Sequence, residues 1–366
     1  MSIIHVTDCF LPRLGGIEVQ VAGLADAQRG AGERVHVVTA TRQAERPPGY
    51  EVHRVAMRLP WNLPVHPRAG KHIDRILAEL RPEVVYAHVG AISPFAWSGI
   101  RAALRLGVPT VAVVHSMWDP AVRRVYRWLD RLEGWTRTPL MLAAVSTAAA
   151  DRMRAALPGA EVSVVPNGIT PVRWRGAPDR RPDGTVHVVS VGRLAPRKQP
   201  MKLLEVLLEA QDKVGNLRAT IAGAGPEMAA MRRFLRRNHV DWVSLPGRLD
   251  REAIGRLLAS ADVFVNPTVA EAFGLATLEA RTAGVPVVAL PGTGVADFVR
   301  DGVEGVLTHD LVGGIVRLAT DPAERRRMAE HNRATEPPCT WPRVLEALRS
   351  CRERAEGKTR EVAGRR

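Results

Sequence analysis

The sequence predicts an α/β protein made of two units, each organised around a parallel β-sheet. Its 366 residues are more than one compact core usually holds. Short runs rich in β-branched residues alternate with helix-like segments, which is the pattern of a parallel sheet covered on both faces. This alternation stops in a stretch crowded with Pro and Gly, residues 166–184, and then starts again, so we interpret that stretch as the connection between the units.

The first half begins with an apolar strand and a glycine-containing loop, and Gly30 and Gly32 end the helix that follows. The same rhythm continues to the connection. We expect strands at 3–7, 35–39, 84–88, 110–115 and 143–146. Helices are expected at 18–29, 71–80, 96–106 and 121–132.

The second half repeats the alternation, so a second sheet of similar size is expected. Its predicted strands are 186–191, 217–222, 242–245, 263–266 and 286–290. Its predicted helices are 201–211, 227–237, 251–260 and 275–283. The tail from Asp321 is helical and charged, and a Pro337-Pro338 break precedes a last helix that begins near Trp341.

The composition excludes several classes of protein. Hydrophobic residues make up 46% and charged residues 25%, ordinary values for a globular protein. No apolar run reaches the ~20 residues of a membrane-spanning helix, and the N-terminus has no pattern of a signal peptide. Three cysteines form no disulfide framework, and their spacing fits no metal site. We therefore expect a cytoplasmic protein.

The formal charge of +14 leaves two interpretations open. Only 5 of the 52 basic residues are lysine, which indicates the drift of a high-GC coding sequence on a solvated surface. The alternative is attraction to anionic substrates or to an anionic membrane. We expect no nucleic-acid partner, because no RNA- or DNA-binding motif accompanies the charge.

Glycine-containing loops follow strands where an open α/β sheet binds its ligands. Gly15 and Gly16 allow backbone amides to approach an anion at the start of a helix, but the loop lacks G-x-G-x-x-G. The segment 223–228 is another candidate loop, with Met as its sixth residue. Arg193 and Lys198 follow the first strand of the second half, and such a pair is suited to neutralising a diphosphate leaving group.

The most informative segment is residues 271–279. Gly274 permits a sharp entry into a helix whose first amides would face a phosphate. Glu271 precedes this helix and Glu279 lies inside it. Two carboxylates beside an anion site repel the phosphate but accept hydrogen bonds from hydroxyls, as a sugar and a ribose would offer.

Six motifs, in order, resemble those of the GT4-like retaining glycosyltransferases, which have the GT-B fold. The segment 271–279 resembles the E-x7-E motif of that family. The other five are Gly15-Gly16 with Glu18, Val165-Pro166-Asn167-Gly168, Gly192-Arg193-Leu194 with Lys198, Ala222-Gly223-Ala224-Gly225-Pro226, and Gly284-Val285-Pro286-Val287-Val288-Ala289.

This resemblance implies the domain organisation. Residues 1–170 would form the acceptor-side Rossmann-like domain and residues 171–335 the domain that binds a nucleotide sugar. Residues 336–366 would form a crossover helix and basic tail, with the helix at about 341–354 packing back on the first domain. The active site would lie in the cleft between two Rossmann-like domains.

The resemblance also implies roles for individual residues. The catalytic set would be His115, which contacts the donor sugar, Arg193 and Lys198, which hold the diphosphate, and Glu271, which holds sugar hydroxyls. The donor-binding set would be Gly15, Gly16, Arg248, Leu249, Phe273, Gly274, Leu275 and Glu279. In it, Glu279 binds the ribose, Arg248 and Leu249 frame the base, and 273–275 present backbone amides. His88 is a weaker candidate than His115.

Two positions depart from the family pattern. Gln199 stands where the family usually has Gly, and Asp297 stands where it usually has Glu, which puts the usual contact of that residue in doubt.

The activity implied by the resemblance is transfer of a sugar, with retention, from a nucleotide diphosphate sugar to an acceptor hydroxyl. The acceptor is expected to be lipid-linked or a cell-envelope glycan. No Asp-x-Asp follows a strand, so no metal and no other cofactor is expected. Three alternatives stay open: a glycosyltransferase of soluble small molecules, a GT-B epimerase or phosphorylase, and a non-enzymatic sugar-nucleotide-binding protein.

The helix predicted after His115 has the pattern of a membrane-surface helix. Arg123, Arg127 and Arg131 share one face, with Arg124 beside them. Val122, Val125, Leu129 and Leu132 would form an apolar stripe with Trp128 at its edge. This pattern predicts peripheral contact of the helix with the anionic inner face of a membrane. The alternative is an ordinary helix of the first domain that packs its apolar stripe against the protein core.

Overall fold

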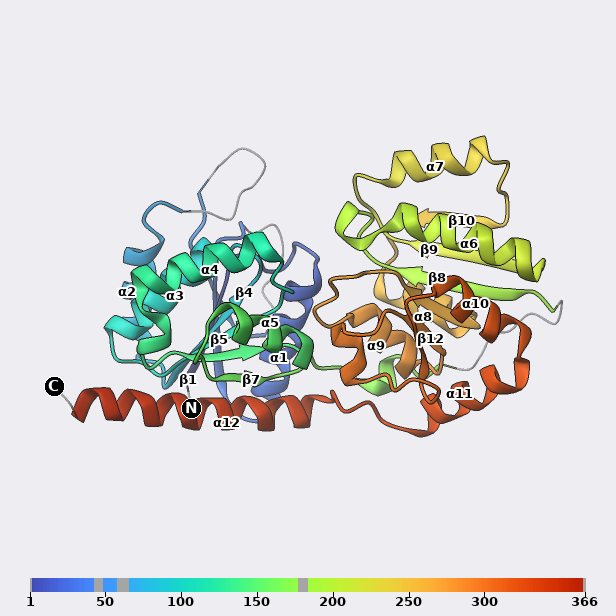
Figure 1. Cartoon of the computed structure of the whole chain (residues 1–366). Helices are drawn as coiled ribbons and strands as arrows, with labels where there is room; N and C mark the ends of the chain where they lie inside the picture. The colour runs from blue at the N-terminus through green and yellow to red at the C-terminus, as the bar shows by residue number, and fades with distance from the viewer. Residues whose placement is uncertain (1, 43–48, 58–65, 177–183, 365–366) are drawn as a thin grey trace. The chain divides into compact units, whose positions relative to one another are not determined.

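The computed structural model describes residues 2–42, 49–57, 66–176 and 184–364, and the chain forms two compact units (Figure 1). The first unit comprises Met1–Gly168 with Trp341–Arg366, and the second comprises Ile169–Thr340. The expected connection, 166–184, lies partly outside the described residues.

The first unit has a seven-stranded sheet in the order β3-β2-β1-β4-β5-β6-β7, in which every neighbouring pair is parallel. Its strands are β1 (Ser2–Thr7), β2 (Arg34–Thr39), β3 (Glu51–Arg54), β4 (Val84–Val89), β5 (Thr110–Val114), β6 (Met141–Ala144) and β7 (Val162–Val164). Its helices are α1 (Gly16–Gly30), α2 (Ala69–Leu80), α3 (Pro94–Arg105), α4 (Pro120–Glu133), α5 (Thr147–Ala156) and α12 (Trp341–Gly364).

The second unit has a six-stranded parallel sheet in the order β10-β9-β8-β11-β12-β13. Its strands are β8 (Val186–Val191), β9 (Leu217–Ala222), β10 (Val243–Gly247), β11 (Val263–Asn266), β12 (Val287–Ala289) and β13 (Gly305–Leu307). Its helices are α6 (Pro200–Val214), α7 (Met228–Arg237), α8 (Arg251–Ala259), α9 (Leu275–Thr282), α10 (Leu311–Thr320) and α11 (Pro322–Ala334). Both sheets are therefore Rossmann-like, as the sequence predicts.

The sequence did not predict β3, β7, β13, α5 or α10. The three strands are three or four residues long, which is too short for a periodic pattern. Helix α10 contains Gly313 and Gly314, which lower helix propensity, and it begins because the Asp310 carboxylate accepts from the Gly313 amide at 2.9 Å. The strand predicted at 143–146 was misplaced, because Ser146 caps α5 and accepts from the Ala149 amide at 3.1 Å.

Central strands are buried on both faces because their sequences are nearly continuous runs of valine, isoleucine and alanine. Every residue of β4 and of β5 is buried. Helices cover each sheet, and the apolar side of α6 packs on α10 and on the valines of the second sheet. Because helices cover both faces of each sheet, the polar loops lie at the end of the sheet where the strands terminate.

Each sheet has a topological switch point, where the strand order reverses and the connections leave to opposite sides. In the first unit it lies between β1 and β4, and in the second between β8 and β11. In open α/β sheets, ligands bind at such points, beyond the carboxyl ends of the strands. Three of the six motifs, those with Gly15, Lys198 and Glu271, follow β1, β8 and β11, so the topology brings them to these edges.

Helix α12 belongs to the first unit, where it packs on α1, β5 and β6. Val344, Leu348, Cys351 and Ala355 form its buried side. The Trp341 ring fits against Gly168, because a Cβ at Gly168 would overlap it. The helix extends to Gly364, past the 341–354 expected. Two of its basic side chains form ion pairs with Glu161, Arg354 at 3.1 Å and Lys358 at 2.9 Å.

Candidate active site

The switch point of the second unit brings together two of the predicted catalytic residues. Lys198 ends the loop after β8, and Glu271 lies in the loop after β11. The Lys198 Nζ donates to Glu271 Oε2 at 2.6 Å. An ammonium has three donors, so this bond leaves two for an anion. With 39% of the lysine side chain exposed and 11% of the glutamate side chain, the pair opens to solvent on the lysine side.

Glu271 is held in place from the side of the sheet. The Asn266 amide, at the end of β11, donates to Glu271 Oε2 at 3.3 Å and to Thr277 Oγ1 at 3.0 Å. The Glu271 carbonyl accepts from the Gly294 amide at 2.9 Å. These contacts fix the backbone and one carboxylate oxygen, so the other oxygen remains for a ligand hydroxyl.

Helix α9 begins immediately after this glutamate. Gly274 adopts φ +90°, a conformation that side chains rarely take, and so turns the chain sharply into the helix. No side chain caps α9 among the described residues, so the amides of its first turn stay available. Phe273 is buried against Phe298, with ring centroids 5.1 Å apart, and Leu275 is half-buried in the first turn.

Glu279 lies in the middle of α9 and has an unusual carboxyl group. Burial raises its pKa to about 7, and the nearby Arg251 guanidinium opposes that shift. Near neutral pH, the group is therefore a mixture of carboxylic acid and carboxylate. Both forms can hydrogen-bond a pair of ribose hydroxyls.

The segment 223–228 shapes the loop that carries Arg193 and Lys198. A Cβ at Gly223 would overlap the Gly192 carbonyl, and one at Gly225 would overlap the Leu194 carbonyl. The two loops are joined because the Leu194 amide donates to the Ala224 carbonyl at 3.0 Å. These glycines permit close contact between the two loop backbones. This packing role accounts for the glycines of segment 223–228, so a dinucleotide-binding role is not needed to explain them.

Arg193 and Arg248 lie exposed on the loops after β8 and β10. Among the described residues, no hydrogen bond or ion pair holds the guanidinium of either. Leu249 is half-buried beside Arg248, and Asp250 then caps α8 by accepting from the Ala253 amide at 2.7 Å. Both arginines are free to meet an anion, but the structure shows no contact that joins either of them to Lys198.

In the first unit, the predicted loop after β1 is organised by a buried carboxylate. Gly15 caps α1 with an extended backbone, and Gly16 is the first residue of that helix. Glu18 is 6% exposed and folds back on Gly15, where a Cβ would overlap its carboxylate. Arg13 balances this charge at 3.7 Å. Gly15 is therefore needed to admit the glutamate.

His115, at the end of β5, is the last member of a chain of three histidines that the sequence did not predict. His115 Nε2 lies 2.9 Å from His88 Nδ1, and His88 Nε2 lies 3.0 Å from His5 Nδ1. At the far end, His5 Nε2 lies 2.7 Å from Gln28 Oε1. The chain crosses β5, β4 and β1 on one face of the sheet, stepping two residues along at each strand.

Burial keeps all three rings neutral. It lowers the pKa of His5 and of His115 to about 4 and that of His88 well below its usual value. Each ring must then donate from one nitrogen and accept at the other. Because Gln28 Oε1 accepts, His5 donates to it from Nε2 and is left to accept from His88 at Nδ1.

Two further groups hold the surroundings of His115. Asn167, from the predicted 165–168 motif, forms a side-chain hydrogen bond with it. Gln20 binds both backbone groups of Gly168, accepting at 2.8 Å and donating at 3.1 Å. His88, His115 and Asn167 line a small pocket together with Trp341 of α12.

Helix α4 differs from its predicted pattern. Its buried face is Val122, Tyr126 and Leu129, because Tyr126 stacks on Trp118 with ring centroids 3.9 Å apart. Leu132, which we placed in the apolar stripe, is 62% exposed, and Trp128 is 57% exposed. The exposed face therefore carries two large apolar side chains together with Arg124, Arg127 and Arg131, whereas Arg123 is half-buried.

No helix among the described residues combines the length and apolarity that a bilayer span requires. The three cysteines form no disulfide bond.

Two family models together match most of the chain. "Glycosyltransferase Family 4" matches residues 14–173, and "Glycosyl transferases group 1" matches residues 177–335. A GDP-mannose-dependent alpha-mannosyltransferase of Mycolicibacterium smegmatis is 30% identical over 95% of this chain and 96% of its own length. The alpha-monoglucosyldiacylglycerol synthase of Acholeplasma laidlawii is 23% identical over 88% of this chain and 89% of its own length.

Solved structures agree on the fold. The complex of Anabaena Alr3699/HepE with UDP and glucose has a TM-score of 0.73 at 18% identity, covering 96% of this chain and 98% of that one. Sucrose-phosphate synthase from Thermosynechococcus elongatus has a TM-score of 0.72 at 18% identity and full coverage of both chains.

Two Rossmann-like units with these loops define a glycosyltransferase of the GT-B fold. The chain belongs to glycosyltransferase family 4, and the predicted family and fold class are confirmed.

Proposed function

We propose that this protein transfers a hexose, with retention and without a catalytic metal, from a nucleotide diphosphate sugar to a lipid-linked acceptor at the cytoplasmic face of a membrane. The observation that carries the donor half of the proposal is the Lys198–Glu271 pair beside the uncapped start of α9. It places a cation and free amides, which suit a diphosphate, next to a carboxylate, which suits sugar hydroxyls. Its mannosyltransferase relatives make GDP-mannose the first donor to test.

The chemistry follows from where charge develops. Departure of the nucleoside diphosphate builds negative charge on the phosphate oxygens, and Lys198, Arg193 and the α9 amides would stabilise it. His115, held neutral by burial, would lie against the donor sugar without adding charge near the anomeric carbon. Gly15 and Gly16 would leave room for the diphosphate and the acceptor.

The donor proposal is tested by thermal unfolding with GDP-mannose, UDP-glucose, UDP-N-acetylglucosamine and ADP-glucose. A donor at 100 times its dissociation constant stabilises the folded state by about 2.7 kcal/mol. We expect one nucleotide class to raise the Tm of the wild type and to be turned over with an acceptor extract. The same donor, incubated without acceptor, separates transfer from epimerisation or phosphorolysis. No stabilisation by any of the four would contradict the proposal.

The metal part is tested by assaying transfer in excess EDTA. We expect activity to be unchanged, because side chains and helix amides supply the positive charge. Complete loss on chelation that Mg²⁺ or Mn²⁺ restores would contradict it.

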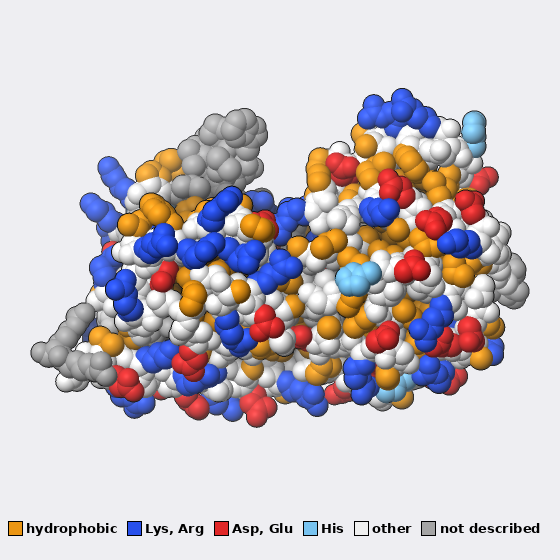
Figure 2. Space-filling view, viewed as in Figure 1, with side chains coloured by type: hydrophobic (Ala, Val, Ile, Leu, Met, Phe, Trp, Pro, Cys, Tyr) orange, Lys and Arg blue, Asp and Glu red, His pale blue; other side chains and the backbone are white. Residues whose placement is uncertain are grey.

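The acceptor half rests on α4. Its exposed face presents Trp128 and Leu132 beside three arginines, and Figure 2 shows Lys and Arg side chains gathered over this part of the first unit. Apolar and aromatic side chains flanked by arginine suit the interface of an anionic bilayer. A relative whose name is that of a diacylglycerol glycolipid synthase supports the same acceptor class.

The test is flotation with liposomes of anionic or of neutral lipid at low and moderate salt. We expect binding that needs anionic lipid and weakens with salt. Replacing Arg124, Arg127 and Arg131 with Gln should abolish it. The matched control replaces Arg232, Arg233 and Arg236 of α7 with Gln, since these arginines lie on the helix that carries another exposed basic face. A wild type that does not float with anionic liposomes even at low salt would favour a soluble acceptor.

A further inference from the structure

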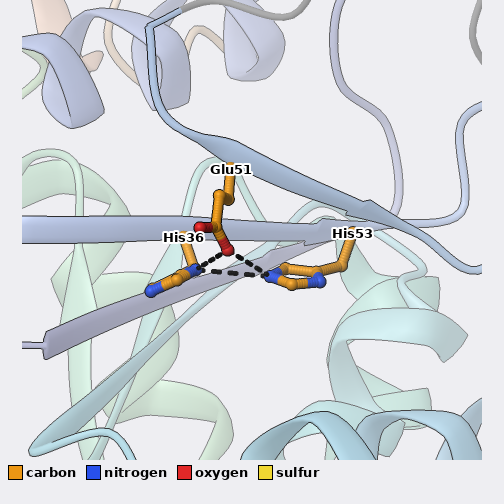
Figure 3. A group of neighbouring side chains, drawn as sticks. All are labelled: His36, Glu51 and His53. Atoms are coloured by element: carbon orange, nitrogen blue, oxygen red, sulfur yellow. Dashed lines mark hydrogen bonds and ion pairs between the residues drawn. The ribbon is translucent and has the colours of Figure 1, made fainter. Parts of the chain in front are cut away.

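Three side chains that the proposed function does not use converge at the edge of the first unit's sheet. His36 comes from β2, and Glu51 and His53 come from β3, the edge strand (Figure 3). In the parallel register His36 is the partner of Glu51, and His53 lies two residues further along. Because side chains alternate along a strand, all three project from one face of the sheet.

The distances between their ligating atoms fit one metal ion. His36 Nδ1 lies 3.2 Å from Glu51 Oε2 and 3.3 Å from His53 Nε2. His53 Nε2 lies 3.8 Å from Glu51 Oε2. A triangle with these sides has its centre about 2.0 Å from each corner, which is the length of a Zn²⁺ bond to imidazole or carboxylate.

We propose that His36, Glu51 and His53 bind a divalent transition-metal ion of the Zn²⁺ type that ties the edge strand β3 to β2. In the absence of a metal, hydrogen bonds from imidazole N–H groups hold these atoms together (Figure 3), and a cation bound between them would take the place of those protons. Two imidazoles and one carboxylate favour Zn²⁺ over Mg²⁺ or Ca²⁺, which prefer sites built from oxygen alone.

The three side chains of the site differ in how much of each is exposed to solvent. The His36 side chain is 1% exposed, that of His53 27% and that of Glu51 61%. The ion can therefore enter from solvent and keep a water as its fourth ligand. Arg34 lies 4.0 Å from Glu51 Oε1, so it engages the oxygen that does not face the imidazoles.

Affinity should be moderate. With Nδ1 on the metal, His36 keeps its proton on Nε2, and that buried atom has no hydrogen-bond partner among the described residues. Metal-binding histidines usually donate this proton to a neighbour, and the lack of such a partner weakens binding. We expect a micromolar dissociation constant.

The experiment uses the full chain, stripped with a chelator and dialysed against Zn²⁺. We expect one Zn²⁺ per chain by elemental analysis, a rise in Tm of a few degrees, and slower hydrogen exchange at the amides of β3. Co²⁺ in place of Zn²⁺ should give the visible absorption of a tetrahedral site.

The test variants are Glu51→Gln and His53→Gln, because both side chains are accessible and their loss leaves the buried His36 in place. Each should weaken Zn²⁺ binding by at least about tenfold, since each removes one of three ligands. The control is His309→Gln, which removes an exposed histidine of the second unit and should change nothing. A wild type that binds no stoichiometric Zn²⁺ would overturn the proposal, and so would equal binding by wild type and both test variants.

This site and the proposed transfer reaction are tested separately. Chelation should lower the Tm while leaving transfer intact. Loss of the metal effect without loss of transfer would overturn only the metal site, and loss of donor binding in Zn²⁺-loaded protein would overturn only the proposed function.

Discussion

The two units hold their candidate site residues in opposite ways. In the second unit, Lys198 and Glu271 are charged, lie on loops and face solvent on one side. In the first unit, His115 is neutral and ends a chain of hydrogen bonds that runs through the sheet to Gln28. One site can therefore act through charge, and the other through the fixed direction of a hydrogen bond.

This difference decides what each site is sensitive to. A charged loop keeps most of its geometry when one side chain is removed, but it loses the charge on which transition-state stabilisation depends. A buried chain of neutral donors and acceptors depends on every member, since an unmatched partner inside the protein is costly. Substitutions in the second unit should affect activity more than folding, and those in the histidine chain should affect both.

The largest effect is expected for the diphosphate contacts. Arg193→Ala or Lys198→Ala should lower transfer by on the order of 10²-fold or more, as for loss of a group that binds the departing charge. The Tm should barely move. Initial rates at saturating acceptor measure this effect.

The control for that pair is Lys202→Ala. Lys202 also binds a glutamate, Glu205 at 3.1 Å, but on the exposed side of α6. Its loss should leave the rate unchanged. Near-normal transfer rates in both the Arg193 and Lys198 variants would contradict the proposal that these two side chains bind the diphosphate.

The next effect is the response of the histidine chain to acid. The folded-state pKa values of His5 and His115 are depressed to about 4, so the unfolded chain binds more protons below pH 6.5. The free energy of unfolding should thus fall as pH decreases from about 6.5 to 4, by about 3 kcal/mol for His5 alone.

Asp8 opposes part of this loss. Burial raises its pKa to about 6, so its contribution to stability is present at low pH and is lost as pH rises through 6. Denaturant titrations of wild type and His5→Gln at pH 7 and 5 separate the two, because the variant should lose less stability on acidification. Equal losses in both proteins would show that His5 does not titrate as described.

Glu279 should show the opposite pH response from the histidines. Its pKa is raised to about 7, so its contribution to stability is present at acidic pH and is lost as pH rises through 7. Glu279→Gln should be as stable as wild type at pH 5.5 and about 1–2 kcal/mol more stable at pH 8.5. This difference in the free energy of unfolding is smaller than the full pKa shift would give, because the side chain is partly exposed to solvent. If the difference in unfolding free energy does not change with pH, the carboxyl is already ionised at pH 5.5.

The smallest effect concerns Gln199. Gln199 stands where the resemblance to the family leads us to expect glycine, and the backbone takes the left-handed conformation, φ +52°. A side chain in that region costs about 1 kcal/mol, and Gly would relieve most of it. Gln199→Gly should raise the free energy of unfolding by ~0.5–1 kcal/mol, measured by denaturant titration. Gln211→Gly, in the interior of α6, should lower it, and stabilisation in both would point to a cause other than the dihedral angle.

Most of the second unit's site could be predicted from the sequence, because its parts are local. A strand, a glycine turn and a helix start place Glu271, Gly274 and Glu279 within one segment, and the topology of the sheet then brings Lys198 to Glu271. The role of Gly223 and Gly225 could not be predicted, since the carbonyls that they admit belong to a loop some thirty residues earlier.

Of the histidine chain in the first unit, the sequence predicted His115 and, as a weaker candidate, His88, but not the contacts that join them. His5, Gln28 and His88 become neighbours of His115 only when the register of three strands is known, and no local spacing encodes that register. The cluster of His36, Glu51 and His53 was missed for a related reason, because β3 is too short to be predicted as a strand. The amphipathic pattern of α4 was predicted, but its buried face was rotated, since the pattern does not show that Tyr126 would stack on Trp118.

The central claim is that the second unit binds a nucleotide diphosphate through the loops after β8 and β11. Calorimetric titration of the best-stabilising nucleoside diphosphate into wild type, Lys198→Ala and Lys202→Ala tests it most directly. We predict that wild type and Lys202→Ala bind alike and that Lys198→Ala binds at least about tenfold more weakly, the loss of one charge-assisted contact. Equal affinity in all three proteins would contradict the account.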